Sequence, residues 1–417
     1  MKKLTIILLL FVSFSYGQNS KTRFIKTEKI TGDSLLWDLK ALSVAPEVKW
    51  LTETGPVRSL LYKSVDYEGK KTEVFAYYSN PDIIAGKPAG TQKFPGVVLI
   101  HGGGGKAFKE WVEKWASEGY AAIAMDLSGN GADGQKIANP GPDQSNENKF
   151  EKIEKGSLKD VWTYHAVASS ILAHSLLLSM PEVDTSKTSV TGISWGGYLT
   201  CIVASLDDRF LGAVPVYGCA YYDESDVFKV PLNQLSADNK KRWMQYFDPS
   251  VYLRYAKPSF FFINGNKDKH YNVEPYIKTY SLVKSSKIVC VIPDMKHSHQ
   301  WGWQPPEIRY FFETLINPGK SFPNITYVSV EKDEFSLVYK MPYTASLTTA
   351  AFYYTNDVES TNEQRVWTMQ EGKSDPDNNK VTFPIPKSGF KYGFFYIKDS
   401  NNISASTTYM VDFKPTN

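Results

Sequence analysis

Residues 192–197 read GISWGG, and this short stretch decides the fold. The residues just before it favour a strand, and from Leu199 onward apolar residues recur with a helical period. Ser194 therefore stands on a sharp strand-to-helix turn, which needs glycines where a Cβ would clash. A serine on such a turn is open to a base, and the helix N-terminus favours negative charge beside it. We interpret Ser194 as a nucleophile; the alternative is a glycine-rich turn with a buried serine.

A second glycine-rich stretch, HGGGG at residues 101–105, follows a buried apolar run at residues 96–100. Four glycines leave backbone N–H groups free to face a ligand. We assign one oxyanion-binding N–H to the region of Gly103, with the amide of Trp195 as the second donor. A nucleotide-binding phosphate loop would need a following Lys-Ser/Thr pair at another spacing. We interpret His101 as structural rather than catalytic.

The acid and the base are expected after the serine in the chain, which leaves His270, His297 and His299 as candidate bases. Residues 264–268 read NGNKD after one predicted strand, and residues 293–299 read PDMKHSH after the next. Both segments leave the carboxyl ends of strands, where ligands bind in open α/β sheets. We therefore interpret Asp268 as the acid and His297 as the base.

Two alternatives stay open for this constellation. Asp223 or Asp226, after the preceding strand, could replace the acid. His297, His299 and Asp294 could instead hold zinc, which needs three protein ligands in tetrahedral geometry. That arrangement would leave the serine motif unexplained, so we expect no metal and no cofactor.

Around these motifs, apolar strands and amphipathic helices alternate from residue 57 to residue 318. Two extended segments joined by a turn at residues 68–70 come first, and repeated β-α units follow. This order predicts an α/β domain with a doubly wound, mostly parallel sheet covered by helices on both faces. His165 and His174 fall on a long apolar helix predicted at residues 158–180, so we interpret them as histidines of the core or as residues that support the site from behind.

The pattern changes after Pro318. Residues 320–417 hold seven short alternating or aromatic runs separated by turn clusters, which predicts a smaller all-β sandwich of the immunoglobulin or fibronectin kind. The strand pattern leaves its role open between packing, substrate binding and dimerisation. Trp367 is its one tryptophan, whereas sugar-binding faces commonly use several aromatic platforms, so we expect no polysaccharide binding by this segment alone.

The composition excludes several classes of protein. The 417 residues are 42% hydrophobic and 22% charged, which fits two or three folded domains rather than a disordered chain or a membrane bundle. The net charge is +3 and the longest basic run is residues 240–242, so we expect no nucleic-acid partner. The three cysteines, Cys201, Cys219 and Cys290, cannot pair completely, and we interpret them as small buried hydrophobic residues; a single disulfide among them is the alternative.

Residues 1–17 have the pattern of a signal peptide. Lys2 and Lys3 precede an apolar run at residues 4–14, and SYG at residues 15–17 supplies small residues for cleavage. The apolar run is too short to span about 30 Å of hydrocarbon. We expect cleavage before Gln18, an N-terminal segment at residues 18–56, and export to a periplasm or beyond, with no membrane span.

Residues 57–318 resemble the α/β-hydrolase fold. GISWGGY at residues 192–198 and the order of Asp268 and His297 look like the branch that contains prolyl-oligopeptidase-like peptidases, acetyl xylan esterases and dienelactone hydrolases. The resemblance implies the same roles for Ser194, Asp268 and His297. The chain departs from the pattern because it has no room for the propeller of many of those peptidases. Trp195 also replaces the usual Gln of the esterases, and Ser194 the usual Cys of the dienelactone hydrolases.

Together these features predict a secreted serine hydrolase that cleaves a carboxylic ester, such as an acetyl group on a carbohydrate, through an acyl-enzyme. The substrate would be a small-molecule or polysaccharide ester. We name Trp301 and Tyr221 as substrate-binding candidates, because aromatic faces stack on sugar rings. The aromatic residues expected near the mouth are Trp195, Tyr221, Tyr222, Trp301 and Trp303. A serine peptidase is the second interpretation, and a catalytically inactive glycan-binding protein is the third.

Overall fold

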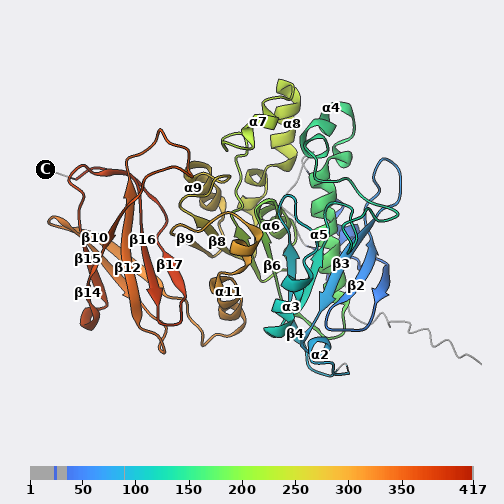
Figure 1. The fold of residues 1–417 in the computed structure, drawn as a ribbon, viewed down its shortest axis with the longest axis horizontal. Coiled ribbons are helices and arrows are strands. Elements are labelled where there is room, and N and C mark those ends of the chain that lie inside the picture. The colour runs from blue at the N-terminus through green and yellow to red at the C-terminus, as the bar shows by residue number, and fades with distance from the viewer. Residues whose placement is uncertain (1–22, 26–34, 89, 416–417) are drawn as a thin grey trace, which may run out of the picture.

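The computed structural model describes residues 23–25, 35–88 and 90–415, so the predicted signal peptide lies outside the described residues. Within them, nine strands form one sheet in the order β1-β2-β3-β5-β4-β6-β7-β8-β9 (Figure 1). The strands are β1 (Val48–Thr52), β2 (Arg58–Lys63), β3 (Glu73–Ser79), β4 (Phe94–Ile100), β5 (Ala121–Met125), β6 (Val183–Ile193), β7 (Gly212–Val216), β8 (Ser259–Gly265) and β9 (Lys287–Ile292).

The sheet is mostly parallel, as the sequence predicted. From β5 through β4 to β9 every neighbouring pair runs parallel, whereas β1, β2 and β3 are antiparallel at the other edge. Strand β1 pairs with β2, so the segment at residues 18–56 contributes an edge strand to the sheet whose start was predicted at residue 57. The turn predicted at residues 68–70 lies between β2 and β3, closed by a bridge between Tyr67 and Lys70.

Helices cover both faces of this sheet. Helices α5 and α6 pack against each other and against β6, while Trp115 of α3 and Phe312 of α11 meet with ring centroids 5.7 Å apart. The helices are α1 (Leu39–Leu42), α2 (Pro81–Ile84), α3 (Lys109–Ser117), α4 (Lys152–Lys155), α5 (Trp162–Ser179), α6 (Trp195–Leu206), α7 (Lys229–Leu232), α8 (Ala237–Phe247), α9 (Val273–Leu282), α10 (His299–Trp303) and α11 (Pro306–Ile316). Among the described residues, no helix combines the length and the apolar character needed to cross a membrane.

The three cysteines are buried and unpaired.

The C-terminal segment forms two antiparallel sheets, drawn in orange and red in Figure 1. In the described part of the chain, one sheet has the order β10-β11-β15-β14, and the other contains β13, β12, β16, β17 and β18. The strands are β10 (Asn324–Glu331), β11 (Glu334–Lys340), β12 (Leu347–Thr355), β13 (Thr368–Glu371), β14 (Lys373–Asp375), β15 (Lys380–Pro384), β16 (Phe390–Asp399), β17 (Ser404–Ser406) and β18 (Met410–Phe413). The all-β architecture is as predicted, but the sequence pattern did not predict the short strands β14 and β17.

The long strand β16 is buried on both of its faces. Phe395 and Ile397 belong to the core between the two C-terminal sheets. Phe394 and Tyr396 point the other way and belong to the core of the α/β domain, since successive side chains of a strand alternate between faces. The sequence did not decide whether the aromatic run in β16 fills a core or stacks on sugars. In the structure it packs into the two cores.

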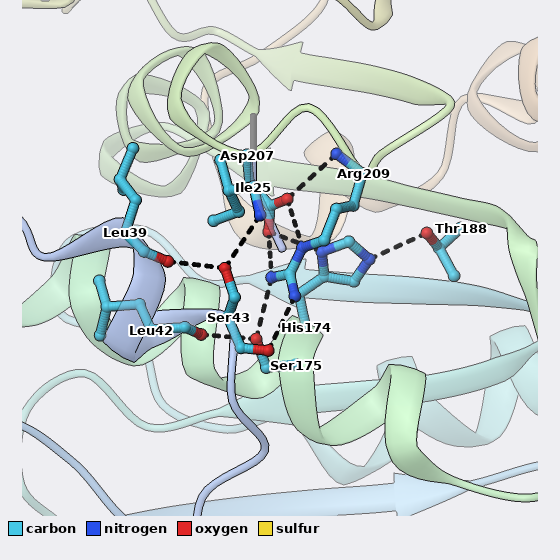
Figure 2. A network of polar contacts seen from close by, with 9 residues as sticks. All are labelled: Ile25, Leu39, Leu42, Ser43, His174, Ser175, Thr188, Asp207 and Arg209. Atoms are coloured by element: carbon cyan, nitrogen blue, oxygen red, sulfur yellow. Dashed lines mark hydrogen bonds and ion pairs between the residues drawn. The ribbon is translucent and has the colours of Figure 1, made fainter. Parts of the chain in front are cut away.

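A buried polar network joins the N-terminal segment to the α/β domain (Figure 2). Arg209 donates from Nε and Nη2 to the two carboxylate oxygens of Asp207, each at 2.7 Å. His174 Nδ1 lies 2.8 Å from the same carboxylate, and its Nε2 lies 2.9 Å from Thr188 Oγ1. Arg209 also donates to the carbonyl of Ser43. Burial lowers the pKa of His174 to about 4, so it is a neutral core histidine, as predicted.

We expect Asp207→Asn to lower the free energy of unfolding by about 3 kcal/mol, because it leaves the Arg209 guanidinium buried without its counter-charge. Asp184→Asn is the matched control, since Asp184 pairs with Lys187 at 3.0 Å where both side chains are partly exposed. That change should cost less than about 1 kcal/mol. Urea unfolding followed by circular dichroism measures both. If both variants lost the same small amount of unfolding free energy, the pair of Asp207 and Arg209 would have no special structural role.

Candidate active site

Ser194 stands between strand β6 and helix α6, on a backbone that L-residues rarely adopt. Its φ is 59° and its ψ is −117°. Two close backbone approaches hold this turn: a Cβ at Gly192 would meet the carbonyl of Gly196, and a Cβ at Gly196 would meet the carbonyl of Ile100. Only glycine fits at either position, so the spacing in GISWGG is a packing requirement of the turn.

Ser194, His297 and Asp268 form one chain of hydrogen bonds. Ser194 Oγ lies 2.9 Å from His297 Nε2, and His297 Nδ1 lies 2.6 Å from Asp268 Oδ2. The second carboxylate oxygen accepts the backbone N–H groups of His270 and Tyr271 at 2.8 Å and 2.7 Å. Asp268 is fully buried, whereas the His297 side chain keeps 10% of its exposure. The three residues follow β6, β8 and β9, so the carboxyl ends of three parallel strands bring them together.

The His297 ring is packed between aromatic neighbours. Tyr217 and His270 each lie with their ring centroid 4.5 Å from that of His297. Burial is the main cause that lowers the pKa of His270 to about 4. His270 is therefore neutral near pH 7 and puts no second positive charge beside an imidazolium at His297.

In the loop of residues 101–105, three glycine amides have hydrogen-bond partners among the described residues. Gly102 N donates to His299 Nε2 at 2.9 Å, Gly104 N to Gln144 Oε1 at 2.9 Å, and Gly105 N to the Gly102 carbonyl at 3.1 Å. Within the described residues, neither Gly103 N nor Trp195 N has a hydrogen-bond partner. Gly103, Ser194 and Trp195 line the same cavity, so these two amides are available to a developing oxyanion there.

Two neutral histidines hold that loop in place. His299 accepts a hydrogen bond at Nε2, so its proton is on Nδ1, and burial lowers its pKa to about 4. His101 accepts the Leu127 N–H at Nε2 and has Nδ1 2.7 Å from the Gly102 carbonyl. His101 is buried, in agreement with the structural role expected for it. The sequence named His299 as a candidate base and as a possible zinc ligand; its contact with the loop depends on α10 lying against residues far away in the chain.

The cavity in front of Ser194 has a volume of about 330 Å³. Its lining is Gly103, Ile193, Ser194, Trp195, Phe228, Lys269, His270, His297, Ser298 and His299. The lining does not include Trp301 or Tyr221, the two candidates for substrate binding. Trp301 is 44% exposed on α10, two residues after His299. Tyr221 instead has Lys278 Nζ 5.6 Å from its ring centroid, and its backbone N–H binds Asp248.

The aromatic residues expected at the mouth lie mostly in the core. Trp195 is 5% exposed, and Tyr222 is fully buried. Trp303 packs on Phe108 and Trp111. Trp195 of α6 and Tyr222 after β7 point inward with ring centroids 5.2 Å apart, and Trp303 of α10 points toward α3. Phe228, which the sequence did not single out, is the other aromatic ring at the cavity wall.

The alternatives left open by the sequence differ from the geometry observed. Asp226 binds Lys229 and Asn272 rather than His297. Both ring nitrogens of His297 are engaged by Asp268 and Ser194, so neither is free for a metal. Among the described residues, no group of three His, Cys, Asp or Glu side chains is arranged to hold a metal ion.

Comparisons with known proteins agree with this fold. Residues 82–273 match the model of the dienelactone hydrolase family. An acetyl xylan esterase from a Paenibacillus species has 20% identity and a TM-score of 0.51, with 66% of this chain and 91% of that chain covered. Acetyl xylan esterase 1 from a Thermoanaerobacterium species has 18% identity and a TM-score of 0.50, with 66% and 89% covered. No curated protein matches the chain by sequence. The nine-stranded sheet, the turn at Ser194 and these matches together show an α/β-hydrolase fold, in which residues 82–273 match the dienelactone hydrolase family.

Proposed function

We propose that this protein is an exported serine hydrolase that cleaves a carboxylic ester with a small acyl group, the alcohol part being a carbohydrate. The observation that carries the proposal is the hydrogen-bonded chain of Ser194, His297 and Asp268 beside a cavity with two unoccupied amides. A nucleophile, a base oriented by an acid, and donors for an oxyanion are the parts that acyl transfer requires.

In the first half of the reaction, Ser194 Oγ attacks the acyl carbon while His297 Nε2 takes its proton. The carbonyl oxygen becomes an oxyanion that accepts hydrogen bonds from the amides of Gly103 and Trp195. Asp268 stabilises the imidazolium and keeps the proton of Nδ1 in place. The C–O bond of the ester then breaks, and the alcohol leaves with the proton that His297 returns. An acyl-serine ester remains.

In the second half, His297 takes a proton from a water molecule, whose oxygen attacks the acyl-serine carbon. The same amides bind the second oxyanion. The bond to Ser194 Oγ breaks, His297 returns its proton to that oxygen, and the carboxylic acid leaves. Atoms balance as the hydrolysis of one ester to one acid and one alcohol.

The cavity supports a small ester rather than a peptide with a free amino terminus. Its volume of about 330 Å³ is at the lower end of ligand-binding cavities, which span about 300–1,000 Å³. Of the described residues that line it, none carries a carboxylate, and Lys269 adds a positive charge. A substrate ammonium group would therefore enter without an ionic partner.

Trp301 supports the carbohydrate part of the proposal. Its ring is exposed two residues from His299, outside the small cavity. An indole there can stack on a sugar ring whose acyl group reaches Ser194. The other expected rings add no such support, because Trp195, Tyr222 and Trp303 pack against core residues and Tyr221 lies against Lys278.

We expect Ser194→Ala and His297→Ala each to lower kcat/KM by about 10³-fold or more, and the double variant to lose little further, because the two residues act as a unit. His299→Ala should cost about 10-fold, since it removes the acceptor that holds Gly102 and loosens the oxyanion loop. Hydrolysis of p-nitrophenyl acetate measures all four variants. Full activity in Ser194→Ala would refute the mechanism, and loss in His299→Ala beyond that in His297→Ala would refute the assignment of the base.

Purified protein should hydrolyse short-chain p-nitrophenyl esters and acetylated xylo-oligosaccharides, and leave aminoacyl p-nitroanilides intact. Trp301→Ala should raise KM for the acetylated oligosaccharide about fivefold, the loss of one stacking contact, without changing p-nitrophenyl acetate kinetics. Tyr343→Ala, which removes an exposed ring in the C-terminal domain, is the control and should change neither substrate. Preferential anilide cleavage would favour a peptidase, and glycan binding without turnover would favour the inactive protein.

The predicted signal peptide gives an independent expectation. The basic residues, the short apolar run and the small residues at 15–17 should direct export and cleavage before Gln18. The intact mass of protein recovered from the periplasm or the medium should therefore correspond to a chain that begins at Gln18. Recovery of a cytoplasmic chain that retains Met1 would contradict export.

A further inference from the structure

A loop of the C-terminal domain reaches the segment that carries the candidate acid. This loop, residues 356–367, connects β12 to β13. Asn362 Nδ2 donates a hydrogen bond of 2.8 Å to the backbone carbonyl of Asp268, although 94 residues separate the two in the chain. Asn362 is only 3% exposed and Asp268 is fully buried. The contact is thus shielded from water, where a lost partner is costly.

The Asn362 side chain is itself held in one orientation. Arg365 Nη1 donates to Asn362 Oδ1 at 3.2 Å, and a guanidinium can only donate, so the Asn362 amide must turn its NH₂ group toward Asp268. Arg365 Nη2 donates to Glu274 Oε1 at 3.0 Å, in the first turn of α9. The guanidinium also lies 5.2 Å from the ring centroid of Tyr392 in β16.

The loop has internal hydrogen bonds that fix its shape. Asp357 accepts the backbone N–H groups of Ser360 and Val366. The Thr361 carbonyl accepts the N–H groups of Gln364 and Arg365. The loop therefore reaches the α/β domain as a formed turn rather than as an extended segment, and it presents Asn362 from a fixed position.

Asp268 depends on its own backbone for the direction of its carboxylate. One carboxylate oxygen binds the N–H groups of His270 and Tyr271, and the other binds His297. A shift of the Asp268 backbone would therefore move the carboxylate relative to His297 Nδ1. The bond from Asn362 is the contact from outside the α/β domain that restrains this carbonyl.

We propose that Asn362 is a positioning residue for Asp268, so that the C-terminal domain is part of the catalytic apparatus rather than a separate module. This inference rests on the proposed function, since it requires Asp268 to act on His297. The strand pattern left the role of the C-terminal domain open between packing, substrate binding and dimerisation. The proposal favours packing, and gives that packing the task of holding Asp268 in place.

Full-length Asn362→Ala tests the proposal with p-nitrophenyl acetate as substrate. We expect kcat to fall about 10-fold with KM changed less than twofold, because a small displacement of a catalytic group mainly affects the transition state. Asn362→Asp keeps the size and the contact with Arg365 but has no donor for the Asp268 carbonyl, and it should give a similar loss. Asn356→Ala is the matched control: Asn356 donates to the Gly389 carbonyl within the C-terminal domain, and its loss should leave kcat unchanged.

A double-mutant cycle separates positioning from general destabilisation. In an Asp268→Asn background, Asn362→Ala should cause no further loss of kcat, because both changes act on the same hydrogen bond to His297. The low-field proton resonance of His297 Nδ1–H should also broaden or move in Asn362→Ala and stay in place in Asn356→Ala. Titration with a fluorophosphonate counts the folded, reactive sites in every sample, so kcat is expressed per active site.

The outcomes distinguish this inference from the proposed function. Wild-type kcat in Asn362→Ala and Asn362→Asp, or a full additional loss in the Asp268→Asn background, would overturn the positioning role while leaving the serine mechanism intact. Full activity in Ser194→Ala would instead refute the mechanism itself. If Asn362→Ala does not fold, the Asn362→Asp cycle decides on the same criteria.

Discussion

The turn at Ser194 is the constraint on which the rest of the site depends. Ser194 has a φ of 59°, which is strained for an L-residue. The close backbone approaches at Gly192, Gly196 and the end of β4, which leave no room for a side chain, hold the turn in this conformation. This approach fixes the carboxyl end of β6 beside the loop of residues 101–105. Ser194 and Gly103 therefore line one cavity, and the strain at Ser194 is offset by the packing around it.

Parallel strand order provides the other half of the site. Ser194, Asp268 and His297 follow β6, β8 and β9, which lie within one half of the sheet. Because parallel strands end at the same edge, residues about 100 positions apart meet within hydrogen-bond distance. Neutral histidines then support this arrangement: His270 lies beside His297, and His299 holds the loop of residues 101–105, and burial keeps both uncharged.

The C-terminal domain has a core of its own between its two sheets, and it also packs apolar side chains into the core of the α/β domain. Strand β16 sends Phe394 and Tyr396 into the core of the α/β domain, and Ser404 N donates to Glu307 Oε1 at 2.8 Å across the boundary. The boundary near Pro318 that the composition indicates is therefore a change of architecture, not a division into independent modules. The contact from Asn362 extends this packing to the backbone of Asp268.

The sequence alone predicted the class of fold, the glycine-flanked turn at Ser194 and the chain order of Ser194, Asp268 and His297, because glycine spacing and hydrophobic period depend on local backbone geometry. It could not place Trp301 and Tyr221 relative to the cavity, assign the Gly102 amide to His299, or find Asn362. Those features are contacts between segments far apart in the chain, and no local pattern encodes them. Whether an aromatic residue lines a mouth or fills a core is decided by which face of its strand or helix meets another element. Only the tertiary structure settles this, since burial is a property of the packed whole.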